Sequence, residues 1–77
     1  MHINMTLGEK VRQLREDMDL TQGALGKELG LTQRKVSYIE SNTYEPSLSD
    51  LKAICTFFEI SANYLLGLPE TLKPYKK

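Results

Sequence analysis

Apolar residues recur every three or four positions through most of the chain, and polar residues fill the positions between them. This spacing is typical of amphipathic helices that bury one face. The first such segment covers about residues 6–18, and its apolar positions are Leu7, Val11, Leu14 and Met18. No segment shows sustained alternation of apolar and polar residues, so the sequence predicts no strands and an all-α fold.

Start and stop signals divide the rest of the chain into four further helices. A Ser or Thr precedes each helix, and its side chain can cap the free N–H groups of the first turn. These N-cap residues are Thr6, Thr21, Thr32, Ser47 and Ser61. Glu9 and Asp50 stand three residues after an N-cap and predict capping boxes. Gly30 and Gly67 predict helix ends, because glycine accepts the left-handed backbone of a C-cap.

Each predicted helix has a few apolar residues to bury. They are Leu25 and Leu29 in the second helix, Val36 and Ile39 in the third, and Leu51, Ile54, Cys55 and Phe58 in the fourth. The fifth helix is short and runs from Ala62 to Leu66. Connections of two to five residues join the helices, which favours a small bundle around one core.

Composition excludes several classes of protein. The chain has 77 residues and forms one domain, 1–77, near the lower limit for a single hydrophobic core. One cysteine, Cys55, permits no intramolecular disulfide and leaves too few ligands for a zinc cluster. The apolar runs are too short for a membrane span or a secretory signal. We therefore expect a protein of the reducing cytoplasm.

The ten basic and ten acidic residues cancel, so net charge gives no support for a nucleic-acid partner. The two signs are nevertheless unevenly placed. Acidic residues gather within 16–19, whereas basic residues lie at Arg34 and Lys35 and in the tail of residues 69–77. We expect this tail, which also contains two prolines, to be flexible.

The second and third helices are separated by a very short turn. Gly30 permits the left-handed backbone of a tight reversal, and Thr32 caps the next helix at once. This is the connection of a helix-turn-helix, over about residues 21–42, whose second helix is free to enter a major groove. Val36 and Ile39 dock that helix on the core. Its outward residues are Gln33, Arg34, Ser37 and Tyr38. Gln can bond adenine at two points and Arg can bond guanine in the same way.

Taken together, these features resemble the Cro/cI-type helix-turn-helix family of phage and bacterial repressors, also called the xenobiotic-response-element family. The matching stretch, residues 20–61, is LTQGALGKELGLTQRKVSYIESNTYEPSLSDLKAICTFFEIS. Thr-Gln opens both helices of the motif, Ile-Glu comes near the end of the second, and Pro-Ser precedes the fourth helix of the chain. The closing NYLLGLPE also resembles small repressors. The resemblance implies a five-helix, lambda-repressor-like DNA-binding domain.

The resemblance also implies which residues contact DNA. Base edges would be read by Gln33, Arg34, Ser37 and Tyr38. Phosphates would be bound by Gln22, Lys35, Asn42, Thr43 and Tyr44. Gln22 opens the second helix, where backbone N–H groups favour anions. For Tyr38, packing against the fourth helix remains an equal alternative to DNA contact.

A buried ion pair between Arg15 and Glu40 is a further implication of the resemblance, with a structural role outside the binding site. Three positions depart from the family pattern. Gly26 stands where Ala is usual, which lowers helix propensity by about 1 kcal/mol. Asn42 replaces the usual Gly, although Asn tolerates the left-handed conformation. Thr43 replaces a basic residue, so with zero net charge we expect modest non-specific affinity.

We therefore expect a sequence-specific, double-stranded DNA-binding transcriptional regulator, and specifically a repressor. The alternative is a protein-interaction module, such as an antitoxin or anti-repressor partner, which keeps the fold without the DNA contacts. The single histidine, His2, and Cys55 are too far apart in sequence for a nucleophile and its base, and no phosphate-cradling glycine loop is present. We expect no enzymatic activity, cofactor, metal or small-molecule substrate.

We also expect a homodimer on a palindromic operator, because one domain of this size buries too little surface for tight specific binding. The candidate interface is the fifth helix and its flank: Tyr64, Leu65, Leu66 and Leu68. A five-residue helix cannot bury all of them, so some should form an exposed apolar patch. The alternative is that Leu65 and Leu66 close the core and only Tyr64 is exposed.

Overall fold

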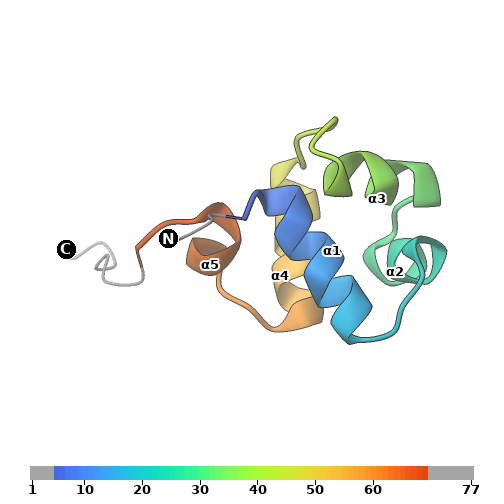
Figure 1. Ribbon diagram of the computed structural model, residues 1–77, viewed down its shortest axis with the longest axis horizontal. Coiled ribbons are helices and arrows are strands. Elements are labelled where there is room, and N and C mark those ends of the chain that lie inside the picture. The colour runs from blue at the N-terminus through green and yellow to red at the C-terminus, as the bar shows by residue number, and fades with distance from the viewer. Residues whose placement is uncertain (1–4, 70–77) are drawn as a thin grey trace.

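The computed structural model describes residues 5–69, which form five helices joined by short connections (Figure 1). The helices are α1 (Leu7–Asp17), α2 (Gln22–Leu29), α3 (Gln33–Glu40), α4 (Leu48–Phe58) and α5 (Ala62–Leu66). Within residues 5–69 there is no strand, as predicted. No helix in this range is long and apolar enough to cross a membrane. His2 and the predicted tail beyond Pro69 lie outside the described residues.

The five predicted N-caps all form. In each, the Ser or Thr hydroxyl accepts the backbone N–H three residues later, at 3.0 or 3.1 Å. Both predicted capping boxes are complete, with Glu9 bonded back to Thr6 and Asp50 bonded back to Ser47. Such a cap contributes roughly 1 kcal/mol relative to Ala, so local chemistry alone sets where most helices begin.

Helix ends depend partly on glycine and partly on tertiary packing. Gly30 and Gly67 end α2 and α5 with φ of 73° and 74°, as predicted. Three non-glycine residues also have left-handed backbone, namely Asp19, Asn42 and Glu59. Asn42 was expected to tolerate this conformation. Asp19 and Glu59 have no glycine-like signal in the sequence, so their conformation was not predicted.

One core lies between the helices, and every helix contributes to it. Its fully buried residues are Val11, Leu25, Val36, Ile39, Ile54 and Leu65, each at most 2% exposed. Burying one such side chain contributes roughly 1.5–3 kcal/mol. Met18 was predicted on the inner face of the first helix, but that prediction was wrong. Its side chain is 50% exposed, because α1 ends at Asp17 and Met18 is only its C-cap.

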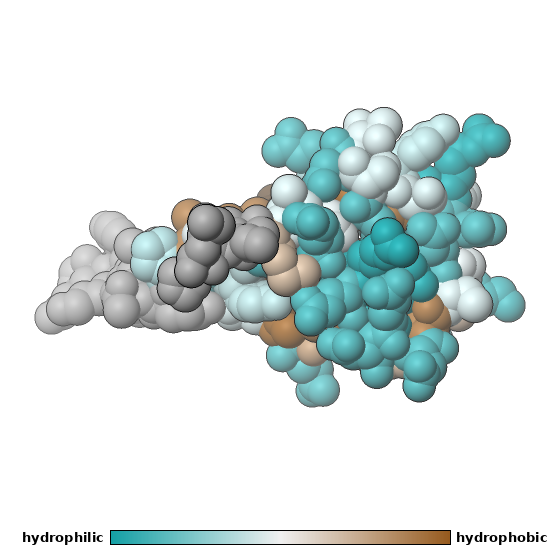
Figure 2. Space-filling view, viewed as in Figure 1, coloured by the Kyte–Doolittle hydropathy of each residue, from teal (hydrophilic) through white to brown (hydrophobic). Residues whose placement is uncertain are grey.

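The arrangement of the helices leaves the outer side of α3 uncovered. α3 packs on α1 and α2, while α5 packs on α1 and α4 at the opposite end of the molecule (Figure 1). Figure 2 shows that the face over α1 is covered mainly by hydrophilic residues. The helix-turn-helix of α2 and α3 therefore lies at one end of a small bundle with a single buried core.

Candidate nucleic-acid interface

The turn between α2 and α3 brings two backbone segments into direct contact. The N–H of Leu31 donates to the carbonyl oxygen of Gly26 at 2.7 Å. A Cβ on Gly26 would lie only 2.6 Å from the carbonyl oxygen of Leu31. Gly26 is therefore required by the close approach at the turn, which explains why a residue of poor helix propensity lies in the middle of α2.

The four predicted base-reading residues share one side of α3. They occupy positions i, i+1, i+4 and i+5 of the helix, starting at Gln33, and so lie on one face. Gln33 and Arg34 are exposed, Ser37 is half-buried and Tyr38 is 45% exposed. The opposite side carries the buried Val36 and Ile39. The face has the donors and acceptors that base edges require, and contact with bases stays a prediction.

The predicted ion pair behind this face is present. Arg15 Nε lies 2.6 Å from Glu40 Oε2, and Nη2 lies 3.0 Å from Oε1. A third guanidinium nitrogen, Nη1, donates to the carbonyl oxygen of Leu20 at 2.8 Å. Hydrogen bonding to Glu40 raises the pKa of Arg15 further above its already high value, against some desolvation. The end of α3 is thereby joined to α1 and to the connection before α2.

Gln22, the predicted phosphate ligand, extends this network to the first residue of α2. Its amide Nε2 donates to Glu40 Oε1 at 3.2 Å. The amide still has a second N–H and a carbonyl oxygen, neither of which has a partner among residues 5–69. The side chain is half-buried and held in place at the start of the helix. A phosphate contact through the remaining N–H stays a prediction.

Lys35, also predicted to contact phosphate, has partners within the protein. Its Nζ lies 3.5 Å from Asp50 Oδ2 and 4.9 Å from the centre of the Tyr44 ring. The contact with the Tyr44 hydroxyl and then the charge of Asp50 raise the pKa of Lys35, against some desolvation. Asp50 was predicted only as a capping residue, because no sequence spacing indicates that it meets a side chain of α3.

Asn42 connects the loop after α3 to α1. Its Oδ1 accepts the N–H of Gly8 at 3.0 Å, and its Nδ2 donates to Thr6 Oγ1 at 2.8 Å. A Cβ on Gly8 would lie 2.4 Å from the carbonyl oxygen of Ile39, so only glycine allows α1 to approach this closely. The Asn42 side chain therefore has a structural task that the sequence did not predict. The Asn42 backbone N–H also donates to the carbonyl oxygen of Ile39, at 3.1 Å. Contact of Asn42 with a phosphate stays a prediction, and it would have to use the second N–H of the side-chain amide.

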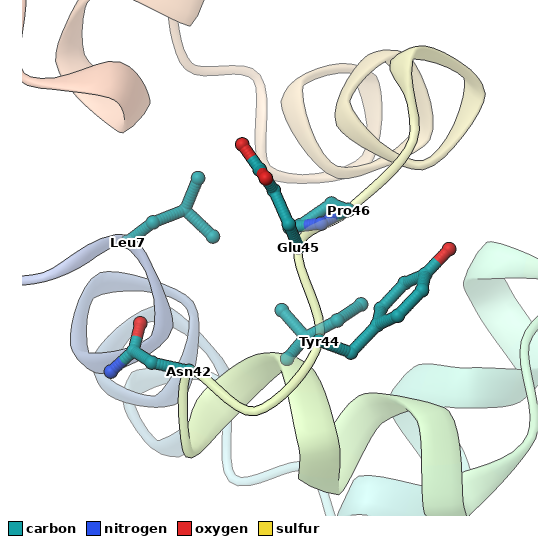
Figure 3. A pocket seen from close by; sticks show the side chains of 6 residues that line it. Leu7, Asn42, Tyr44, Glu45 and Pro46 are labelled. Atoms are coloured by element: carbon teal, nitrogen blue, oxygen red, sulfur yellow. The ribbon is translucent and has the colours of Figure 1, made fainter.

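The rest of the loop is anchored at Tyr44. The Tyr44 hydroxyl lies 3.5 Å from Asp50 Oδ2, while Thr43 is exposed and its hydroxyl pairs with that of Ser41 at 2.8 Å. Asn42 and Tyr44 line a surface pocket of about 320 Å³ beside Leu7 (Figure 3). In Figure 3 the Tyr44 ring points away from Leu7. The loop is thus held at two points, with the predicted phosphate contact Thr43 exposed between them.

The predicted dimer residues fall into two groups. Leu65 is 1% exposed and belongs to the core, so its assignment to an interface was wrong. Successive side chains of a helix point in different directions, so Leu65 faces the core while Tyr64 and Leu66 are exposed. Tyr64, Leu66 and Leu68 are 43%, 47% and 46% exposed. The Tyr64 carbonyl oxygen accepts a hydrogen bond from the Lys10 ammonium at 2.7 Å, and this bond links α5 to α1.

Comparison with known proteins assigns the family. Residues 11–65 match the family model described as Helix-turn-helix. This chain belongs to the Cro/cI-type helix-turn-helix family. Both the family predicted by resemblance and the five-helix, lambda-repressor-like fold are confirmed.

Among solved structures, the P22 c2 repressor in complex with a synthetic operator is similar, with a TM-score of 0.77 and 32% identity. The match covers 82% of this chain and 96% of that one. The immunity repressor protein of Bacillus phage phi105 is 34% identical over 68 residues, or 88% of this chain and 46% of that protein. The uncharacterized regulator YgzD of Bacillus subtilis (strain 168) is 34% identical, with 79% and 92% covered. This chain spans less than half of the phage phi105 relative.

Proposed function

We propose that this domain binds double-stranded DNA in a sequence-specific manner and acts as a transcriptional repressor. The observation that carries the proposal is the exposed face of α3, whose residues Gln33 and Arg34 lie at the N-terminal end of the second helix of the motif. That end of such a helix is the part that meets base edges in the major groove. The similar P22 c2 repressor is bound to a synthetic operator, which supports the same mode here.

Phosphate binding would come from two sides of α3. On one side, the N-terminus of α2 offers backbone N–H groups and the remaining N–H of the Gln22 amide. On the other side, the exposed side chain of Thr43 lies on the anchored loop, whose backbone N–H groups at residues 42–44 already donate within the protein. These contacts set the register of α3 on the duplex, while Gln33 and Arg34 supply the sequence information.

The charge distribution predicts a modest electrostatic contribution. Residues 5–69 contain seven Lys and Arg side chains. Four have partners within the protein: Lys10, Arg12, Arg15 and Lys35. The three without a partner among these residues are Lys27, Arg34 and Lys52. Within residues 5–69, few cations are therefore available to displace counterions from DNA, and the affinity of this part should depend on base contacts more than on net attraction.

Two copies would be needed for tight binding, and the proposal therefore includes a homodimer on a palindromic operator. The exposed Tyr64, Leu66 and Leu68 of the α5 region supply the candidate contact. Such a regulator works in the cytoplasm, where bacterial DNA is found, and its action needs no catalytic group.

Selection of duplexes from a random-sequence pool tests the function directly. The wild-type protein should enrich one palindromic sequence and retard it in a gel, with weaker retardation as salt increases. The matched control is a Gln33→Ala, Arg34→Ala double variant, which removes the two exposed readers without touching the core. It should fold and lose the enrichment. If the wild type enriches and retards no duplex, the protein-interaction alternative replaces the proposal.

A further inference from the structure

Asp50 is a charged side chain in an almost buried position, with only 8% of it exposed. Its Oδ2 accepts the backbone N–H of Ser47 at 3.2 Å, and the Tyr44 hydroxyl lies 3.5 Å from the same oxygen. Both donors are neutral. A carboxylate at this depth is costly unless a cation also compensates its charge.

Lys35 supplies that cation from the neighbouring helix. Its ammonium lies 3.5 Å from Asp50 Oδ2 and 4.9 Å from the centre of the Tyr44 ring. The carboxylate and the face of the aromatic ring therefore attract the same charge. α3, the loop after it and the first turn of α4 meet at this one group.

We propose that Lys35 is a positioning residue, which keeps its ammonium on Asp50 when the domain binds DNA and so holds α3 against the loop and α4. The inference rests on the proposed DNA-binding function. It gives Lys35 a different role from the phosphate contact that the family resemblance implies. The cation that α3 offers to DNA is then Arg34, which is exposed and has no partner among residues 5–69.

The energetics favour this division between two adjacent cations. A phosphate contact that drew the Lys35 ammonium away from Asp50 would leave a nearly buried carboxylate without its cation. That carboxylate would then also face the negative charge of the DNA backbone. Arg34 is exposed and loses no ion pair on binding, so it meets the DNA charge at lower cost.

The salt dependence of affinity distinguishes a positioning residue from a phosphate contact, because each neutralised phosphate releases counterions. The probe is a duplex that the wild-type protein has selected, and binding is followed by fluorescence anisotropy over a series of KCl concentrations. Lys35→Met should lower affinity by about two- to fivefold, as for loss of a partly exposed ion pair, and leave the salt slope unchanged. Arg34→Met is the matched control for loss of a base-reading cation, and it should lower affinity for the selected duplex far more than affinity for an unrelated duplex.

Urea unfolding tests the pair without DNA. Lys35→Met and Asp50→Asn should each destabilise the domain, and the double variant should lose less than the two single losses together. Lys35→Arg should restore most of both stability and affinity. Glu9→Gln, in the equivalent capping box of α1, controls for the loss of a cap alone and should show no coupling to Lys35→Met.

The salt-dependence and unfolding measurements can each contradict the proposal independently. If wild-type protein binds and Lys35→Met reduces the slope by about 0.9, Lys35 contacts phosphate and the positioning role is overturned. Strictly additive unfolding losses would overturn it as well, because the two side chains would then not interact. If the wild-type protein selects no duplex at all, both the proposed function and the role of Lys35 in DNA binding are wrong. The unfolding data would still decide whether the Lys35–Asp50 ion pair exists.

Discussion

Arg15 of α1 and Glu40 of α3 are joined at two points, with Nε 2.6 Å from Oε2 and Nη2 3.0 Å from Oε1. Both side chains are nearly buried, at 12% and 4% exposure. Glu40 also accepts a hydrogen bond from Gln22 at the start of α2. One carboxylate therefore connects the three helices that build and support the helix-turn-helix.

Removing Glu40 should be costly because Arg15 would remain charged in a largely buried position. We expect Glu40→Ala to lower the free energy of unfolding by about 3–5 kcal/mol, measured by urea unfolding. The Arg15→Ala, Glu40→Ala double variant should lose less than the two single losses together. Glu16→Ala is the matched control, because its pair with Arg12 is exposed and worth at most about 0.5 kcal/mol. Additive losses at Arg15 and Glu40 would contradict the coupling.

Arg34 should act as a base reader. It is exposed at the N-terminal end of α3 and engages no group within residues 5–69. On the selected operator, Arg34→Ala should cost about 1–3 kcal/mol and relax the preference at one base pair in each half-site. Binding to a panel of single-base operator variants measures this. A uniform loss across the whole panel would show that Arg34 contacts only the backbone.

The two glycines inside α2 should respond oppositely to alanine. A Cβ on Gly26 would lie 2.6 Å from a backbone oxygen, whereas on Gly23 the nearest atom is the Thr21 hydroxyl at 4.0 Å. Gly26→Ala should therefore destabilise the domain by about 1–3 kcal/mol through forced backbone movement. Gly23→Ala should stabilise it by about 0.4–1 kcal/mol, because Ala has the higher helix propensity. Thermal unfolding of both variants, with their folds checked by circular dichroism, shows whether each substitution raises or lowers the stability of the domain.

Local chemistry made the helices predictable from the sequence. The N-caps and capping boxes depend on residues three positions apart, so spacing alone located Thr6 with Glu9 and Ser47 with Asp50. The apolar spacing likewise identified the core residues of α1 to α4, such as Leu25, but Leu65 of α5 was assigned to an interface. The short turn after α2 similarly marked the helix-turn-helix before any tertiary contact was considered.

Contacts between distant residues were not predictable in the same way. The Asn42 side-chain amide is hydrogen-bonded to Gly8 of α1, which lies 34 positions earlier in the sequence. No local sequence pattern indicates this contact. The contact of Lys35 with Asp50 also depends on how α3 and α4 are arranged in space. The Arg15–Glu40 pair was foreseen only because the family resemblance supplied it. The residues of the candidate site could thus be predicted from the sequence, but the residues that they contact could be identified only from the fold.

The proposed homodimer needs a contact surface, and the exposed apolar residues of the α5 region are its candidate. Leu66 is 47% exposed and lines, with Leu48 and Leu51 of α4, a mainly apolar surface pocket of about 350 Å³. Leu48 is 70% exposed, so the apolar surface continues from α5 onto α4. An apolar area of this kind on a small domain usually marks an interface.

We expect Leu66→Glu to weaken self-association by at least about tenfold, because a charge would have to be desolvated at the contact, which costs more than about 1.4 kcal/mol. Sedimentation equilibrium, with and without the selected operator, measures this. Met18→Glu is the matched control, since Met18 is equally exposed at the far end of α1. Leu65→Ala should instead lower stability by about 2–5 kcal/mol, because its side chain is in the core.

The proposed homodimer also predicts the geometry of the operator. Paired copies should place their α3 helices one DNA turn apart, roughly 34 Å, so half-sites should be centred about 10 base pairs from each other. Inserting five base pairs between the half-sites rotates one of them by about half a turn and should abolish tight binding of the dimer. Leu66→Glu should bind the normal and the lengthened operator equally weakly, because its copies bind independently. A wild-type protein that remains monomeric at every concentration and binds DNA one to one would show that α5 is not an interface.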